Sequence, residues 1–386
     1  MSRALLALAL LAACAPAAAQ ECPAPPAGEA QPAAAVRWLS QDALEGRLAG
    51  SPGERCAGDY LAAEFARIGL KPTGEGGTFF QDVSLASAMN PHAQAGTGRN
   101  VVGLLEGADP ALRGEAVVVG AHYDHLGRGE RFSLGAQGQV HNGADDNASG
   151  VAALLSIAEA LARGPRPART VVFIAFTGEE GGLLGSARYA AAPAVPLDRT
   201  RAMLNLDMVG RLEGKPLLVY GTGTAAEMEA LVRAAGAAEG MELALHPDGY
   251  GPSDHTSFYA RDVPVLHLFT NVHGDYHRPS DDAEKVDVPG VRRVASLAAR
   301  IVADVAARPA ALTHVAGAGT PPRPPSSSGS GSGSGYGSYL GTVPDFTPVE
   351  HGVKLSGVRA GSPAERAGIR GGDVIVAMDD AEIADL

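Results

Sequence analysis

Carboxylate and imidazole side chains recur where apolar runs of this sequence end. The runs span residues 116–121, 170–176, 202–206 and 263–269. One polar residue after such a run could be a hydrogen-bonded core residue, but an apolar core does not tolerate a whole set of them unpaired. The set therefore indicates one shared site. Its members are His122 and Asp124, then Asp145 and Asp146 in the turn NGADDNASG, Glu179 and Glu180, Asp207, and finally His273, Tyr276 and His277.

Three carboxylates and two histidines are a donor set that suits two divalent zinc ions. The two ions bring four positive charges and the carboxylates bring three negative ones, so a bridging hydroxide makes the sum zero. Paired metals of this kind activate water and stabilise the oxyanion of an acyl transition state. In the pair Glu179–Glu180, one carboxylate can bind metal while its neighbour serves as the general base. The residue types thus predict metal-assisted hydrolysis.

Other patterns indicate weaker alternatives. GTGTAA at residues 221–226 imitates a dinucleotide-binding fingerprint, but it lacks a clear acidic partner. Ser253, Asp254 and His255 have the residue types of a serine-hydrolase triad, yet consecutive residues cannot form its relay geometry. We expect Asp254 to shape the pocket beside the metals instead. No HExxH motif occurs in the sequence, which counts against the common zinc endopeptidases.

Four histidines have less defined roles. His267 lies inside an apolar run and is expected to be a core residue. His125, His141 and His273 lie in polar loops, where each could contact substrate or support a metal ligand.

The elements that position these residues follow from hydrophobic periodicity. The apolar runs are continuous rather than alternating, as in strands of a mainly parallel sheet that helices cover on both faces. Residues 150–163 place their apolar side chains on one helical face. A second helix is predicted from Asp287, a capping residue, through Pro289 in its first turn to about Arg308. We expect an α/β fold with a mixed, mainly parallel central sheet, whose strand ends carry the site.

Seven motifs follow one another along the chain: LEGRLAGSPG, GAHYDH, GADDNASG, TGEEGGLLGS, NLDMVG, SDHTSF and YHRPSD. As a set they resemble the bacterial co-catalytic di-zinc aminopeptidases, family twenty-eight of metallopeptidase clan MH. The resemblance covers residues 35–308, within a predicted catalytic domain of residues 35–312. It implies that His122 and Asp207 bind one zinc, that Glu180 and His277 bind the other, and that Asp146 bridges both.

The resemblance implies further roles and an activity. Glu179 matches the general base, Asp124 a residue that orients His122, and Tyr276 a tyrosine that hydrogen-bonds the oxyanion. The peptide bond after Asp146 is expected to be cis, as in the family. The implied reaction is hydrolysis of the first peptide bond of peptides with a free amino end.

Three alternatives to that activity differ in what they require. A zinc carboxypeptidase would need only different substrate loops, which the sequence does not reveal. A glutaminyl cyclase on the same fold would use one zinc, whereas the presence of both His122 and Asp207 favours two. A non-enzymatic scaffold would require missing ligands, and none of the five is missing.

The amino terminus predicts export. Arg3 precedes an apolar run from Ala4 to Ala13, which is too short to anchor in a bilayer. Cleavage after residue 19, at AAAQ, would remove an ordinary signal peptide, whereas LAAC at residues 11–14 would leave Cys14 lipidated as an outer-membrane anchor. The expected location is the periplasm, the outer membrane or the medium. A net charge of −12 argues against nucleic acid as a partner.

Cysteine usage fits an exported protein. Apart from Cys14, the sequence contains Cys22 and Cys56, which can pair in an oxidising compartment. Two unrelated thiols are the alternative.

Two further segments flank the predicted catalytic domain. Residues 20–34 are rich in Ala and Pro and are expected to form a tether, and residues 313–338 a Pro/Ser/Gly linker. Residues 339–386, with GSPAERAGIRGGDVI, resemble part of a β-rich PDZ domain, a class that binds peptide ends by strand addition. We expect this segment to be incomplete, without the groove-forming helix and last strands of such a domain, and therefore do not expect it to bind peptides.

Overall fold

The computed structural model describes residues 22–26, 31–85, 93–129, 133, 138–318, 340, 342–344, 351–358, 362–378 and 381–383. The predicted export signal with Cys14, part of the tether and most of the linker lie outside the described residues. Within them, no helix combines the length and apolar character needed to span a membrane.

A mixed sheet forms the centre of the fold, with strand order β1-β3-β5-β4-β6-β9-β7-β8 and β2 paired with β3. Its four middle strands are parallel: β5 (Thr170–Phe176), β4 (Ala116–His122), β6 (Thr200–Leu206) and β9 (Val265–Phe269). Strands β4 and β5 are buried along their whole length. The predicted α/β fold with a mainly parallel central sheet is confirmed, because each of these strands coincides with a predicted apolar run.

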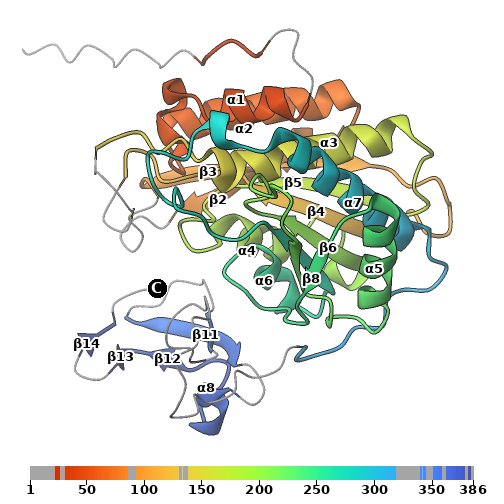
Figure 1. Ribbon diagram of the computed structural model, residues 1–386. Helices are drawn as coiled ribbons and strands as arrows, with labels where there is room; N and C mark the ends of the chain where they lie inside the picture. Colours follow the sequence, from red (N-terminus) through yellow and green to blue (C-terminus); the bar gives the residue numbers. More distant parts are fainter. Residues whose placement is uncertain are drawn as a thin grey trace, which may run out of the picture.

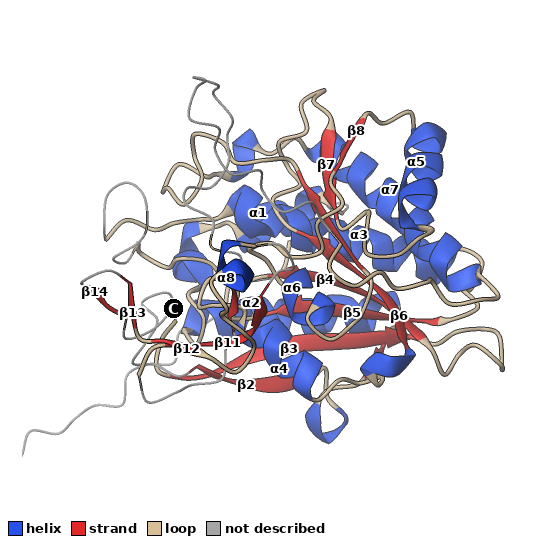
Figure 2. Ribbon diagram, turned by 90° about the horizontal axis from the view of Figure 1, so that it is seen from below, coloured by secondary structure: helices blue, strands red, loops and turns tan. Residues whose placement is uncertain are grey.

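Antiparallel pairing occurs toward both edges of the sheet. On one side β3 (Gly96–Leu105) pairs with β5, and β1 (Lys71–Pro72) and β2 (Phe80–Leu85) pair with β3. On the other side β7 (Leu217–Tyr220) pairs antiparallel with β9 and parallel with β8 (Leu243–Leu245). Figure 2 shows how the strands cross the molecule as one twisted sheet. The sequence pattern does not predict β2 and β3, since polar residues and glycines interrupt their apolar positions.

Helices cover both faces of the sheet (Figure 1). The two faces have separate cores: Val117 and Val119 of β4 pack with α3 and α7, whereas Val118 packs with α4 and α6. This alternation is the period of two expected along a strand. The first face carries α1 (Ala33–Leu39), α2 (Pro52–Ile68), α3 (Gly150–Arg163), α5 (Met228–Glu239) and α7 (Val288–Ala307), and the second carries α4 (Leu184–Ala191) and α6 (His255–Tyr259).

Both predicted helices and the predicted disulfide are confirmed. Helix α3 has the predicted bounds, and α7 begins after Asp287, whose carboxylate accepts the N–H of Gly290 at 3.0 Å. Cys22 and Cys56 form a disulfide with their Cα atoms 5.4 Å apart. This bond joins residues before α1 to α2.

The carboxyl-terminal segment has its own small elements. Strands β10 (Thr342–Pro344), β11 (Val353–Val358) and β12 (Val374–Ile375) form an antiparallel sheet, and β13 (Ala377–Met378) pairs with β14 (Ala381–Glu382). The short helix α8 (Pro363–Arg366) lies between β11 and β12 in the chain, and Ser362 caps it by accepting the N–H of Glu365. The PDZ-like character of this segment stays a prediction.

Candidate metal centre

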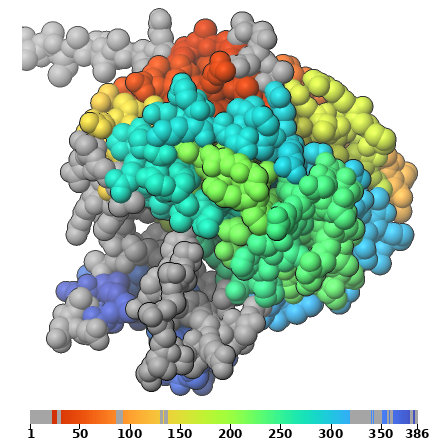
Figure 3. Space-filling view, in the orientation of Figure 1, coloured from red at the N-terminus to blue at the C-terminus, as the bar shows by residue number. Residues whose placement is uncertain are grey.

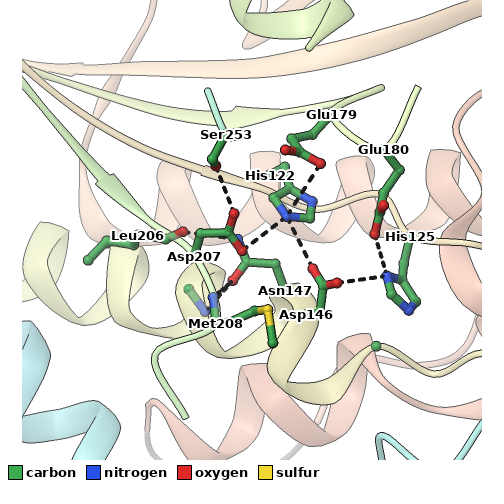
Figure 4. Close-up of polar contacts among 12 residues, drawn as sticks. His122, His125, Asp146, Asn147, Glu179, Glu180, Leu206, Asp207, Met208 and Ser253 are labelled. Atoms are coloured by element: carbon green, nitrogen blue, oxygen red, sulfur yellow. Dashed lines mark hydrogen bonds and ion pairs between the residues drawn. The ribbon is translucent and has the colours of Figure 1, made fainter. Parts of the chain in front are cut away.

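The carboxyl ends of the parallel strands bring together the predicted site residues. His122 is the last residue of β4, Glu179 and Glu180 follow β5, and Asp207 follows β6. Because adjacent parallel strands end at the same edge of a sheet, these side chains converge there. Figure 4 shows His122 facing Glu179, Asp207 and Asp146.

Asp146 reaches this edge from the turn before α3. Its peptide bond to Asn147 is cis, as predicted. The Asn147 side chain ties the turn to β6, because Nδ2 donates to the carbonyl of Leu206 at 2.9 Å and Oδ1 accepts the N–H of Met208 at 3.1 Å. The turn is thereby fixed beside Asp207.

Asp146 lies between two groups of donor atoms. Its Oδ1 is 3.3 Å from Nε2 of His122, which is also 3.4 Å from Oδ1 of Asp207. Its Oδ2 is 3.3 Å from Nε2 of His277, which is also 3.3 Å from Oε2 of Glu180. The five residues predicted as ligands are therefore close together in two groups that share one carboxylate.

These spacings fit zinc. Two ligand atoms about 2.1 Å from a tetrahedral zinc ion lie roughly 3.4 Å from each other, close to the distances above. Oδ1 of Asp207 is buried and accepts no hydrogen bond from any described residue, as expected of an atom that binds metal. The side chains present thus match zinc in both chemistry and distance.

The loop that carries His277 reaches the site from the strand that pairs with β6. It follows β9, spans residues 270–287, and lies beside α1 on the surface, where Figure 3 shows it in cyan next to the red amino-terminal segment. The Tyr276 ring stacks on the His277 imidazole, with ring centroids 3.8 Å apart. Tyr276 therefore lies at the edge of the site, where the sequence predicts it.

Comparisons with known proteins agree with this geometry. The family model described as peptidase family M28 matches residues 100–302, more than half of the 386 residues. The chain belongs to peptidase family M28. This M28 chain is 30% identical over 191 residues to leupeptin-inactivating enzyme 1 of Streptomyces exfoliatus, covering 49% of the chain and 39% of that relative.

A second relative and a solved structure complete the comparison. Aminopeptidase YwaD of Bacillus subtilis is 28% identical over 211 residues, covering 52% of the chain and 43% of the relative. The chain thus spans less than half the length of either of these curated relatives. The solved aminopeptidase from Aneurinibacillus sp. strain AM-1 superposes with a TM-score of 0.57 at 22% identity, over 73% of this chain and 95% of that one. This likeness shows the same fold.

His125 belongs to the centre of this M28 chain, although the sequence places it among general loop histidines. Its Nδ1 lies 2.8 Å from Oε1 of Glu180 and 3.9 Å from Oδ2 of Asp146. Among the described residues, His125 with these two carboxylates is one of two sets whose donor atoms all lie within 4.8 Å of one another, the other being His122, Asp146 and Asp207. The shorter distance is that of a hydrogen bond, whereas His277 is 3.3 Å from both carboxylates. We therefore favour His277 as the ligand and His125 as the residue that orients Glu180. Its position three residues after His122 in AHYDH is the signal that could have identified it.

Asp124 contacts His122 mainly through its backbone. Nδ1 of His122 donates to the Asp124 carbonyl at 3.2 Å, and the nearest carboxylate oxygen is 3.7 Å away. This hydrogen bond orients the ring so that Nε2 of His122 faces Asp146 and Asp207, where it can bind metal once its proton is displaced. The Asp124 carboxylate instead accepts the N–H of Glu179 at 3.2 Å. Asp124 thus contacts His122, which it is predicted to orient, and it also holds the Glu179 loop, which the sequence does not predict.

Glu179 is an acidic residue of the site that belongs to neither group. Its Oε2 lies 4.0 Å from Nε2 of His122, and its side chain is only 10% exposed. Burial raises the pKa of Glu179 well above its ordinary value. Burial also raises the pKa of Asp254 to about 7. A carboxyl group with a raised pKa is suited to exchange protons near neutral pH.

Several other candidates have structural partners. Asp145 accepts hydrogen bonds from Ser149 at 2.9 Å and from the N–H of Gly210 at 2.6 Å, and its other carboxylate oxygen lies 3.1 Å from His273. Asp145 is thus held by the fold, which agrees with the choice of Asp146 as the bridging residue. Nδ1 of His141 donates to the carbonyl of Gln139 at 2.9 Å, so this imidazole supports its own loop.

Ser253 does not act in a triad. Its hydroxyl donates to Oδ2 of Asp207 at 2.7 Å and accepts from Asn205 at 2.7 Å. His267 is a buried residue of β9, as predicted, and it stacks on His255 with ring centroids 4.5 Å apart. Burial lowers the pKa of His267 to about 4, so its ring is neutral.

The centre attracts positive charge. Burial alone would lower the pKa of His277, but the carboxylates of Glu180 and Asp146 raise it to about 11. The carboxylates of Glu179 and Asp207 likewise raise the pKa of His122 against the effect of burial. A divalent cation would displace these protons and neutralise the same carboxylates.

Proposed function

We propose that this M28 chain is a two-zinc aminopeptidase, which hydrolyses the first peptide bond of peptides with a free amino end. The observation that carries the proposal is the position of Asp146, whose two carboxylate oxygens each lie 3.3 Å from a different histidine. In this assignment His122 and Asp207 would hold one ion, His277 and Glu180 the other, and Asp146 both.

The reaction divides between the metals and the chain. Zinc, when bound, would lower the pKa of a water molecule and polarise the carbonyl of the scissile bond. Glu179 would accept the proton of the attacking water and pass it to the leaving amine, since it lies beside His122 and belongs to neither group of proposed ligands. Tyr276, stacked on His277, would donate its hydroxyl hydrogen to the developing oxyanion.

The free α-amine of the substrate supplies the direction of cleavage. The carboxylates of a pocket that excludes water stabilise a cationic amine electrostatically. Binding of the amine there would fix the first peptide bond over the metals. The Bacillus relative and the superposed structure are both named aminopeptidases, which supports the same direction. We also propose that the protein acts outside the cytoplasm, supported by the Cys22–Cys56 disulfide, because disulfides persist in oxidising compartments.

One peptide digested in two forms tests the proposal. The form with a free amino end should shorten one residue at a time from that end, as read by mass spectrometry, and its acetylated form should be nearly inert. Metal analysis of the same preparation should give two zinc ions per chain. Cleavage of the acetylated peptide at internal bonds, shortening from the carboxyl end, or cyclisation of an amino-terminal glutamine without hydrolysis would each overturn the assignment.

A further inference from the structure

Arg47 contacts two of the loops that carry metal-site residues. Its side chain is fully buried, and every hydrogen bond that its guanidinium donates goes to a backbone carbonyl. Nε donates to Tyr123 at 2.8 Å, in the loop after β4, and Nη1 to Leu39 at the end of α1. The same Nη1 donates to Asn142 at 2.7 Å, and Nη2 to Gly143 at 3.0 Å, both in the turn before Asp146.

The backbone around Arg47 is shaped to place it there. Glu45, Gly46 and Arg47 have φ angles of 51°, 68° and 49°, three consecutive residues in the left-handed region. A Cβ on Gly46 would lie 2.2 Å from the carbonyl oxygen of Gly127, so only glycine fits that position. The carbonyl of Arg47 also accepts the N–H of His125 at 3.2 Å. The segment thus joins the loop that contains His122 and His125 by both backbone and side chain.

An acidic residue holds the same turn from the opposite side. Oδ2 of the fully buried Asp281 accepts the N–H groups of Asp145 and Asp146, at 2.8 and 3.0 Å. Its Oδ1 accepts from Arg211 at 3.0 Å. Arg47 binds carbonyls at the start of the turn and Asp281 binds N–H groups at its end, so the backbone that presents Asp146 is fixed at both ends.

Charge supports this role. Asp124, Asp146, Asp281 and Glu180 all act electrostatically on Arg47, which keeps a positive charge at neutral pH even though burial lowers its pKa to about 10. A permanent cation beside these carboxylates reduces their mutual repulsion when metal is absent. The planar guanidinium directs several N–H donors to fixed points, which a lysine ammonium does not.

We propose that Arg47 is a positioning residue that holds the loops around residues 122–125 and 142–146 in metal-binding geometry before zinc arrives. This inference rests on the proposed function. It extends the site beyond residues 100–302, where the M28 model matches, into the amino-terminal segment.

Zinc affinity of purified variants tests the proposal, measured on metal-free protein by competition with a chromogenic chelator. Arg47→Met should bind zinc more weakly by roughly tenfold to a hundredfold, the usual range for residues that support ligands. Arg47→Lys should lie between Arg47→Met and the wild type, and Asp281→Asn should also weaken zinc binding. Hydrogen exchange of the amides at residues 142–146 should be faster in the metal-free variants than in the metal-free wild type, and slow in the zinc-loaded wild type.

Arg169→Met provides the matched control. Arg169 is also a fully buried arginine that donates to backbone carbonyls, those of Val305, Ala306 and Arg308, and it donates to the Glu115 carboxylate as well. It precedes β5, at the opposite edge of the sheet. This variant should lose thermal stability while its zinc affinity stays unchanged. If Arg47→Met does not fold, the zinc affinities of Arg47→Lys and Asp281→Asn test the positioning role.

The outcomes distinguish the positioning role of Arg47 from the proposed function of the protein. Folded Arg47 variants with wild-type zinc affinity, or an equal loss of affinity in Arg169→Met, would overturn the positioning role alone. A wild-type protein that binds no zinc and leaves free peptides intact would overturn the proposed function itself.

Discussion

Glu179 and Glu180 are neighbours in the chain, but their carboxylates face different histidines. Oε2 of Glu179 lies 4.0 Å from Nε2 of His122, whereas Oε1 of Glu180 lies 2.8 Å from Nδ1 of His125. The Glu179 N–H is held by Asp124 at 3.2 Å, so the divergence is anchored in the backbone. Two adjacent residues of one type can therefore have separate roles.

Substitution of each glutamate should separate those roles. Glu179→Ala is expected to keep two zinc ions per chain while kcat falls by at least about 10²-fold, because proton transfer is lost and the metal ligands remain. Glu180→Ala should lose zinc. Metal analysis and peptide hydrolysis on both variants check this, and zinc loss in Glu179→Ala with retention in Glu180→Ala would show that the two roles are exchanged.

The two histidines near Glu180 should differ in the same way. His277→Ala is expected to lose about one zinc equivalent, because it removes a donor atom 3.3 Å from both Glu180 and Asp146. His125→Ala should keep both sites and bind zinc roughly tenfold to a hundredfold more weakly, as a residue that orients a ligand. Zinc stoichiometry at saturating metal distinguishes the two variants. A lost equivalent in His125→Ala, with both retained in His277→Ala, would reverse the assignment.

The disulfide should stabilise the amino-terminal half of the fold. Closing a loop with a sequence separation of 34 removes chain entropy from the unfolded state, worth roughly 3–4 kcal/mol. Cys22→Ser should lower the free energy of unfolding by about that amount, as should reduction of the wild type. Urea unfolding measures the change, and mass analysis without reductant counts the thiols. Two free thiols in exported protein would contradict the bond.

An ion-pair cluster remote from the metal centre predicts a dependence of stability on pH. Glu115 accepts hydrogen bonds from Arg201 and Arg169, each at 2.7 Å, and these lower its pKa from 4.5 to about 2. A carboxylate whose folded pKa is depressed stabilises the fold above its unfolded pKa and loses that effect as pH falls through the folded value.

Glu115→Gln should therefore destabilise the protein at neutral pH by about 1–2 kcal/mol, a figure reduced because solvent partly screens the cluster. The difference from wild type should shrink below pH 4.5 and vanish near pH 2. Denaturant unfolding at pH 7 and pH 3 measures it. An equal difference at both pH values would mean that packing, and not charge, accounts for the effect.

The sequence by itself determined the central strands, the helices α3 and α7, and which polar residues meet at the candidate site. These features depend on local patterns, because a buried parallel strand needs a continuous apolar run and a helix needs a cap and an apolar face. The polar residues directly after such runs then have to meet at one edge of the sheet. His122, Asp146, Glu180, Asp207 and His277 follow from that rule together with the matched motifs.

Tertiary structure alone decided which side chains support these residues. Arg47 and Asp281 lie far apart in the sequence, yet they hold the two ends of one turn. His125 contacts Glu180 across 55 positions. Their partners are mostly backbone groups or residues distant in the chain, and a backbone carbonyl has no residue type by which a sequence could reveal it. A residue's type shows what it can donate or accept, but only the folded chain determines what lies within reach.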